Sequence, residues 1–169
     1  MGVAESANAL DRNKVRPGDV VVGLRSPNLR SNGFSLVRAI MGEELVDHAD
    51  VLLEPSVIYS PAVMDAVDKG GVHSAAHITG GGIVTNLARA LPEGLGSAVD
   101  TGRWRRPEVF DLIADRGVPE EEMRRTFNLG IGFCLVVDPE SEDEIMEVVS
   151  LHDPVALGVV ASSDGVVLR

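Results

Sequence analysis

Short apolar runs alternate with segments of helical periodicity along this chain, and a polar or glycine-rich loop follows each of the first two runs. Residues 20–24 form one run, and residues 34–41 then repeat apolar side chains at helical spacing. Residues 72–79 form another, which leads through the glycines at 80–82 into a helical pattern over 83–91. This order predicts strands joined to helices by loops, as in folds where helices cover a sheet.

The remaining predicted elements make the sheet mixed. A helix over 60–69 is predicted to begin with Ser60 as its N-cap. Ser141 and Glu144 match a capping box and predict a helix up to residue 149. Further helices are predicted at 107–116 and 120–125, and strands at 131–137, 156–160 and 166–168. A short turn joins the last two strands, which predicts an antiparallel hairpin. The predicted fold class is α+β with an α/β-like order of elements, a mixed sheet flanked by helices.

The composition favours one domain with an aliphatic interior. The chain has 169 residues, which is within the usual size of a single domain, and 44% of them are hydrophobic but only 4% aromatic. Val, Leu, Ile and Ala must therefore fill the interior, as in sheets covered by helices. The net charge of −11 argues against nucleic acid or an anionic membrane as a partner, because both attract Lys and Arg.

Cysteine and histidine usage predicts neither a disulfide nor a metal site. Cys134 is the only cysteine and lies in the apolar run 131–137, where a buried thiol is expected. The four histidines lack the close spacing of a zinc-binding helix, so no metal ligand is predicted. No apolar run approaches the roughly 18 residues of a membrane span, and the first ten residues lack the pattern of a secretory signal. A soluble cytoplasmic protein is expected.

The glycine run is the strongest local signal for a binding site. Gly80, Gly81 and Gly82 follow a predicted strand and precede a predicted helix, where backbone N–H groups and the helix dipole favour an anion. The run is not a Walker A loop, because no Lys follows the glycines. A glycine run at this position equally suits tight packing of strand against helix, so the local pattern leaves both interpretations open.

Two further loops carry polar side chains that suit a ligand. Arg30, Ser31, Asn32 and Gly33 follow the first strand, and the same residue types also form ordinary turns and helix caps. Asn128 precedes the predicted strand at 131–137 and suits either a ligand or nearby backbone groups. Neither loop by itself distinguishes a ligand-binding site from an ordinary turn.

Taken in order, these segments resemble the successive signatures of the aminoimidazole ribonucleotide synthetase family. The motifs are Gly23-Leu24-Arg25-Ser26, Ser31-Asn32-Gly33-Phe34-Ser35-Leu36-Val37-Arg38, His77-Ile78-Thr79-Gly80-Gly81-Gly82 and Thr126-Phe127-Asn128-Leu129-Gly130-Ile131-Gly132. The resemblance covers about residues 14–169, and four motifs in the same order are more specific than any one of them.

The resemblance implies a C-terminal domain that works with an N-terminal ATP-binding domain. Residues 14–169 are then the C-terminal domain, and residues 1–13 are the remnant of an interdomain segment. The implied activity is the ATP-dependent cyclo-ligase step of purine biosynthesis, which closes formylglycinamidine ribonucleotide to aminoimidazole ribonucleotide. ATP and Mg²⁺ are expected mainly through the other domain, and a homodimer is expected for the full enzyme. The isolated chain is expected to be inactive.

The resemblance also assigns roles to residues of the three loops. His77 is the predicted catalytic residue, close enough to the substrate to orient it or donate to it. The predicted substrate- and phosphate-binding residues are Arg30, Ser31, Asn32, Gly33, Thr79, Gly80, Gly81, Gly82 and Asn128. The family often has His where this chain has Arg30, and an arginine suits a phosphate clamp rather than proton transfer.

Two alternatives remain open from the sequence. One is a paralogue that also activates an oxygen with ATP, of the thiamine-phosphate kinase, selenophosphate synthetase or hydrogenase maturation type. The other is a module that binds phosphate without turnover.

Overall fold

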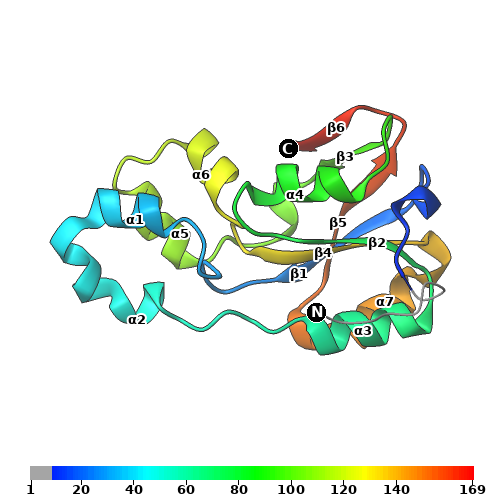
Figure 1. Cartoon of the computed structure of the whole chain (residues 1–169), viewed down its shortest axis with the longest axis horizontal. Helices are drawn as coiled ribbons and strands as arrows, with labels where there is room; N and C mark the ends of the chain where they lie inside the picture. The colour runs from blue at the N-terminus through cyan, green and yellow to red at the C-terminus, as the bar shows by residue number, and fades with distance from the viewer. Residues whose placement is uncertain (1–8) are drawn as a thin grey trace.

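The computed structural model describes residues 9–169. Six strands form one mixed sheet at its centre (Figure 1). The strands are β1 (Val20–Arg25), β2 (Val72–His77), β3 (Gly96–Val99), β4 (Ile131–Val137), β5 (Val155–Ala161) and β6 (Gly165–Leu168). Their order across the sheet is β2-β4-β1-β5-β3-β6, and among these neighbours β3 and β6 form the one parallel pair. The predicted fold class, α+β with a mixed sheet flanked by helices, is confirmed. Of the predicted interdomain remnant 1–13, the first eight residues lie outside the described part.

Side-chain alternation along β1 shows how the sheet acquires two apolar faces. Val20, Val22 and Leu24 pack on one face with helices α3 (Ser60–Lys69) and α7 (Glu142–Val148). Val21 packs on the opposite face with helix α4 (Gly82–Ala90). Figure 1 shows α3 and α7 below the sheet and α4 above it. Both faces of β1 are buried because a strand points successive side chains to opposite sides.

A third apolar cluster lies beyond the end of the sheet, at the left of Figure 1. It is built by helices α1 (Phe34–Met41), α2 (Ala49–Leu52), α5 (Glu108–Ala114) and α6 (Glu120–Thr126). Val37, Phe110 and Phe127 are fully buried within it, and the rings of Phe110 and Phe127 lie 5.9 Å apart. Short 3-10 helices complete the chain: η2 (Arg12–Lys14), η3 (Gly42–His48), η4 (Thr101–Arg103), η5 (Pro139–Ser141) and η6 (Ser150–His152).

The predicted C-terminal hairpin is wrong in its pairing. β5 and β6 run in opposite directions, but β3 lies between them, antiparallel to β5 and parallel to β6. Gly96 makes this insertion feasible, because a Cβ there would come within 1.9 Å of the carbonyl oxygen of Gly165. The sequence did not predict β3, whose four residues read Gly-Ser-Ala-Val.

One predicted helix cap is misplaced, and a second lacks its predicted hydrogen bond. Ser60 is the first residue of α3 rather than its cap, and the preceding Tyr59 occupies the N-cap position. Ser141 is the N-cap residue of α7, as predicted, but its side chain makes no capping hydrogen bond with the described residues. It ends the 3-10 helix η5 and keeps a helical backbone, with φ −104° and ψ −1°, whereas a capping side chain normally requires an extended one.

The strand order explains why distant loops meet. β1 and β2 both pair antiparallel with β4, so they run parallel to each other on its two sides. Leu24 of β1 and His77 of β2 both align with Phe133 of β4. The loops that leave β1 and β2 therefore emerge beside the segment that enters β4.

Candidate functional site

Asn32 joins the loop after β1 to the loop after β2. Its Oδ1 accepts a hydrogen bond from the backbone N–H of Gly80 at 3.2 Å, and its Nδ2 donates to the carbonyl of Arg30 at 2.8 Å. The residues Arg30 to Gly33 and Thr79 to Gly82 are thereby held together across 48 positions of sequence. The structure brings the first two predicted loops into one site.

Asn86 of α4 fixes the glycine loop by hydrogen bonds to its backbone carbonyl groups. This asparagine is buried, and its Nδ2 lies within 3.3 Å of the carbonyl oxygens of Thr79 and Gly80 and 2.7 Å from that of Gly82. Thr79 completes the arrangement by donating its hydroxyl to Asn86 Oδ1 at 3.4 Å. We call Asn32, Thr79, Gly80–Gly82 and Asn86 the asparagine node. Its carbonyl groups find partners within the chain, which fixes the loop's shape.

The glycines of the node allow the backbone of α4 to pack closely against α6, and they also leave backbone N–H groups unobstructed. Gly82 has a φ of +66°, and a Cβ there would lie 2.0 Å from the carbonyl oxygen of Arg124, so α4 approaches α6 through this glycine. The N–H of Gly82 donates to Thr79 O at 3.2 Å. The N–H of Gly81 has no hydrogen-bond partner among residues 9–169, and Gly80 is exposed. Tight packing therefore accounts for Gly82, while anion binding remains a prediction centred on Gly81.

Arg30 points to the other side of the same loop. Its residue is 9% exposed, and its guanidinium carbon lies 4.6 Å from the ring centre of Tyr59. Its Nη2 contacts His77 Nε2, whereas Nε and Nη1 are buried and have no hydrogen-bond partner within residues 9–169. No carboxylate of the described residues forms an ion pair with it. Within residues 9–169, Arg30 is thus a buried cation accompanied by the Tyr59 side chain and the His77 imidazole rather than by a carboxylate.

The contact with Arg30 determines the state of His77. An arginine carries only donors, so Nε2 of His77 must accept, and the ring proton then resides on Nδ1. Burial and, secondly, the positive charge of Arg30 lower the pKa of His77. The ring also stacks on Phe133, with centres 5.7 Å apart and planes at 26°. His77 is therefore a neutral imidazole whose Nδ1–H is its donor.

A cavity of about 360 Å³ lies between β2, β4, α3 and the Arg30 loop. It is lined by Arg30, Val57, Ile58, Tyr59, Ser60, Val63, Met64, His77 and Phe133. We call it the arginine cavity. Its walls are mainly apolar and aromatic with few polar groups, the usual character of a small-molecule site.

Tyr59 fixes the floor of the arginine cavity. Its hydroxyl donates to the carbonyl of Arg25 at 2.5 Å, and burial raises its pKa although Arg30 partly offsets that effect. The hydroxyl also faces Gly132, where a Cβ would lie 2.3 Å from it. Gly132 is thus the residue that lets Tyr59 and Arg30 lie against β4.

The other predicted site residues support these loops. Ser31 is exposed, and its hydroxyl lies 3.5 Å from that of Ser56. Gly33 is the N-cap of α1 with φ +76°, and a Cβ there would overlap the Phe127 ring at 2.2 Å. Asn128 is buried: its Nδ2 donates to Asn28 O at 2.9 Å, and its Oδ1 accepts from Gly130 N–H at 2.7 Å. Asn128 therefore braces the Arg30 loop through backbone groups.

Sequence reasoning missed Asn86 and Tyr59. Asn86 follows Ile83 by three positions, so a polar residue on the apolar face of the predicted helix was the available signal. Tyr59 is the chain's single tyrosine, but nothing in its neighbourhood indicated a partner 29 residues earlier. Only the folded sheet brings Tyr59 to Arg30.

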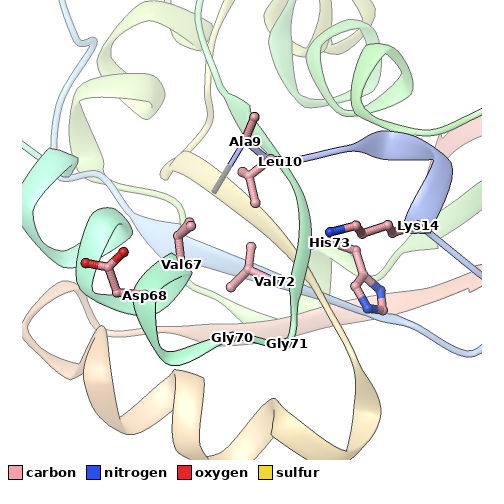
Figure 2. Close-up of a pocket in the computed structure, with 9 residues that line it drawn as sticks. All are labelled: Ala9, Leu10, Lys14, Val67, Asp68, Gly70, Gly71, Val72 and His73. Carbon is pink, nitrogen blue, oxygen red and sulfur yellow. The ribbon is translucent and has the colours of Figure 1, made fainter. Parts of the chain in front are cut away.

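A larger cavity, of about 540 Å³, lies at the opposite end of β2 from His77 (Figure 2). Figure 2 shows its walls formed by Ala9, Leu10, Lys14, Val67, Asp68, Gly70, Gly71, Val72 and His73. The ring of His73 already pairs with Asp19, with 2.7 Å between Nδ1 and Oδ2. None of the predicted site residues lines this cavity.

The described residues show neither a metal-binding cluster nor a membrane-spanning helix. Residues 9–169 contain no group of three His, Cys, Asp or Glu side chains placed to hold a metal ion. Within the same residues, no helix combines the length and apolarity needed to cross a bilayer. Cys134 is fully buried, and this burial raises the pKa of its thiol to about 12.

Comparison with known families gives one match over nearly the whole chain. The family model described as "AIR synthase related protein, C-terminal domain" matches residues 16–169. The chloroplastic phosphoribosylformylglycinamidine cyclo-ligase of Arabidopsis thaliana is 41% identical, over 98% of this chain and 46% of that protein. The human trifunctional purine biosynthetic protein adenosine-3 is 40% identical, over 90% of this chain but 17% of that protein. The chain spans about half the length of the curated cyclo-ligases it matches.

Solved structures with much lower identity share the fold. HypE of E. coli, a hydrogenase maturation protein, has a TM-score of 0.67 at 18% identity, over 95% of this chain and 49% of that one. PurL of T. maritima complexed with ADP has a TM-score of 0.60 at 17% identity, over 97% of this chain and 25% of that one. The architecture therefore recurs as one part of several longer proteins.

Proposed function

Because the chain belongs to the family of AIR synthase related proteins as a C-terminal domain, we propose that it supplies half of the active site of an ATP-dependent cyclo-ligase. The reaction closes formylglycinamidine ribonucleotide to aminoimidazole ribonucleotide, with ADP and phosphate as the other products. The observation that carries the proposal is the Asn32 bridge, which unites two of the resembled motifs in the loops that follow β1 and β2. Identity of 40–42% to named cyclo-ligases supports this choice within the family.

The chemistry requires positioned phosphates rather than a protein nucleophile. Phosphoryl transfer from ATP turns the formyl amide oxygen into a leaving group, and an amidine nitrogen then attacks the same carbon as phosphate departs. Catalysis of such a step rests on orientation and on stabilisation of charge. Backbone N–H groups, a hydroxyl and a cation are the groups that do this, and this chain offers each of them at the site.

Each predicted residue has a role that its position supports. The free N–H of Gly81, the exposed Gly80 and the hydroxyl of Ser31 are proposed to bind the ribonucleotide phosphate. His77 is proposed to donate Nδ1–H to the substrate, because its Nε2 is engaged by Arg30. Arg30 adds positive potential beside this pocket. The remaining predicted binding residues shape the loops: Asn32, Gly33, Thr79, Gly82 and Asn128.

The rest of the proposal concerns the whole enzyme. An N-terminal ATP-binding domain is the proposed partner, with ATP and Mg²⁺ bound mainly through it, and the full enzyme is proposed to be a homodimer. The isolated chain is proposed to be inactive, and the enzyme is proposed to be cytoplasmic. Two of the curated relatives are named as chloroplastic or mitochondrial proteins, so the compartment varies within the family.

Reconstitution tests the proposal directly. The chain is mixed with the N-terminal half of a curated cyclo-ligase, and formation of ADP and of aminoimidazole ribonucleotide is measured with the formylglycinamidine substrate. We expect turnover in the mixture and none with either half alone. Release of ADP with thiamine phosphate, but not with the formylglycinamidine substrate, would reassign the chain to a paralogue.

A matched pair of variants locates the site in that assay. Asn32→Ala removes the bridge between the loops, and we expect a loss of kcat/KM of about tenfold or more. Ser35→Ala alters an exposed residue of α1 and is expected to leave turnover unchanged. Equal turnover of both variants would remove the Asn32 bridge from the mechanism.

A further inference from the structure

Among the residues that the structure describes, no carboxylate forms an ion pair with the buried Arg30. The residue is 9% exposed, and two of its three guanidinium nitrogens are buried without a partner. Removing a cation from water is costly unless an anion and hydrogen bonds compensate for it. The Tyr59 ring, 4.6 Å from the guanidinium carbon, compensates only in part. The site therefore favours the binding of an anion beside Arg30.

Nη2 is the guanidinium nitrogen that a ligand can reach, and it is the one that contacts His77. Nε and Nη1 are covered by protein, but Nη2 contacts the imidazole of His77. His77 is exposed at the end of β2, so its ring can turn away without leaving a buried gap. An anion entering the arginine cavity can take its place at Nη2.

The cavity walls indicate what such an anion is attached to. Tyr59 and Phe133 present aromatic rings 5.8 Å apart, and Val63 and Met64 add apolar surface from α3. Ile58 at the cavity is 74% exposed and Met64 is 55% exposed. Apolar surface of this kind is stabilised when a flat or apolar body covers it.

We propose that the arginine cavity binds a small organic anion, a carboxylate or phosphate carried on a flat apolar body, and that this anion replaces His77 at Arg30 Nη2. This site is distinct from the glycine loop, where the proposed function places the ribonucleotide phosphate. It shares with that function the residue His77, whose proton affinity then depends on whether the cavity is filled.

The coupling to His77 has a definite direction. The positive charge of Arg30 contributes, after burial, to the lowered pKa of His77. A bound anion neutralises that charge and releases the ring from its acceptor role, so the pKa of His77 rises. Filling the cavity thus favours a protonated His77 beside the proposed substrate site.

The test follows the His77 imidazole by NMR during titration of the intact chain. Sodium benzoate supplies an anion on a flat ring, acetate an anion with little body, and benzyl alcohol a ring without charge. We expect a saturable shift of the His77 signals and a rise of its pKa with benzoate, weaker binding of acetate, and no pKa change with benzyl alcohol. Inorganic phosphate serves as the second anion and is titrated into the wild type and Arg30→Met, because the glycine loop is itself a proposed phosphate site. We expect only a weak Arg30-dependent effect of phosphate on His77.

Variants separate the cavity from a general salt effect. Arg30→Met should weaken benzoate binding at least about tenfold, whereas Arg38→Met, on the exposed face of α1, should leave it unchanged. Met64→Glu places a negative charge at an exposed position of the cavity and should also weaken it. Circular dichroism establishes that each variant is folded.

Three results would overturn the inference. A benzoate-dependent shift of His77 that persists in Arg30→Met would show that the anion binds elsewhere. Equal binding of benzoate and benzyl alcohol would remove the role of charge. Arg30-dependent binding of phosphate that is tighter than that of benzoate would remove the role of the apolar walls. None of these measurements uses the cyclo-ligase reaction, so their failure is distinguishable from failure of the proposed function.

Discussion

The asparagine node and the arginine cavity lie on two sides of one loop pair, and they are built on opposite principles. In the node, neutral amides and carbonyls satisfy one another, with Asn86 alone reaching three carbonyl groups. In the cavity, a cation is buried with two nitrogens unpartnered. Buried polar groups are normally satisfied, and exceptions call for a reason. The difference teaches that the node makes the loop's shape, while the cavity retains a capacity for a ligand.

The largest effect is expected where the node meets α6. Gly82→Ala forces a side chain onto a backbone at φ +66° and brings Cβ to 2.0 Å from Arg124 O. We expect the free energy of unfolding to fall by about 4 kcal/mol or more, because both backbones must shift. Urea denaturation measures it. Gly80→Ala is the control, since its Cβ meets nothing closer than Asn32 Oδ1 at 3.9 Å, and equal losses would refute the packing role of Gly82.

The next largest effect tests whether the node depends on its central amide. Asn86→Ala leaves the carbonyls of Thr79, Gly80 and Gly82 without their common donor. We expect a loss of about 2–3 kcal/mol in the free energy of unfolding. Thr85→Ala, at the exposed neighbouring position of α4, should change it by less than about 0.5 kcal/mol. If Asn86→Ala were equally mild, the node would not be the element that fixes the loop.

Replacing Arg30 in the arginine cavity should leave the free energy of unfolding unchanged or raise it, in contrast to replacing Asn86. Arg30→Met replaces an uncompensated buried cation with an apolar side chain of similar length, so we expect stability to be unchanged or to rise by about 1 kcal/mol. Arg38→Met on α1 provides the matched exposed arginine. A loss of several kcal/mol on removal of Arg30 would contradict the contrast, because it would make Arg30 a structural residue like Asn86.

The smallest effect is a dependence on pH. Burial and Arg30 lower the pKa of His77 below its ordinary value of 6.5, so in acid the unfolded chain takes up this proton before the folded chain does. The contribution of His77 to stability is therefore present above pH 6.5 and is lost as the pH falls towards the folded pKa. Denaturation at several pH values should show this loss, reduced in Arg30→Met and absent in His77→Gln. An identical pH dependence in all three proteins would remove the link between Arg30 and His77.

Much of the secondary structure followed from local pattern. The apolar runs that became β1, β2 and β4 and the helical spacings of α1, α4 and α7 are properties of adjacent residues. β3 did not follow, since Gly96–Val99 is short and contains one β-branched residue. Its place between β5 and β6 comes from long-range pairing. The caps failed for a related reason, because the backbone that precedes α3 and α7 is helical rather than extended.

The site followed from the sequence only in part. The three loops were identified by their residue types, and the resemblance ordered them, but their meeting depends on β4 entering between β1 and β2. The sequence also could not show that Arg30 faces Tyr59 while Asn32, two residues later, faces Gly80. Arg30 and Ser31 have positive φ values of 54° and 57°, which change the direction of the chain between Arg30 and Asn32. Neither residue type predicts that conformation.

The central position of β4 has a consequence for how the protein is made. β1 and β2 emerge from the ribosome with no contact between them in the final sheet, and their common neighbour begins only at Ile131. The loops at Arg30 and Gly80 are therefore translated before β4 and can be brought together only after β4 has been made. Because distant pairings close slowly, ligand-binding capacity should arise as one of the last events of folding, and nascent chains that stop before β4 should lack it.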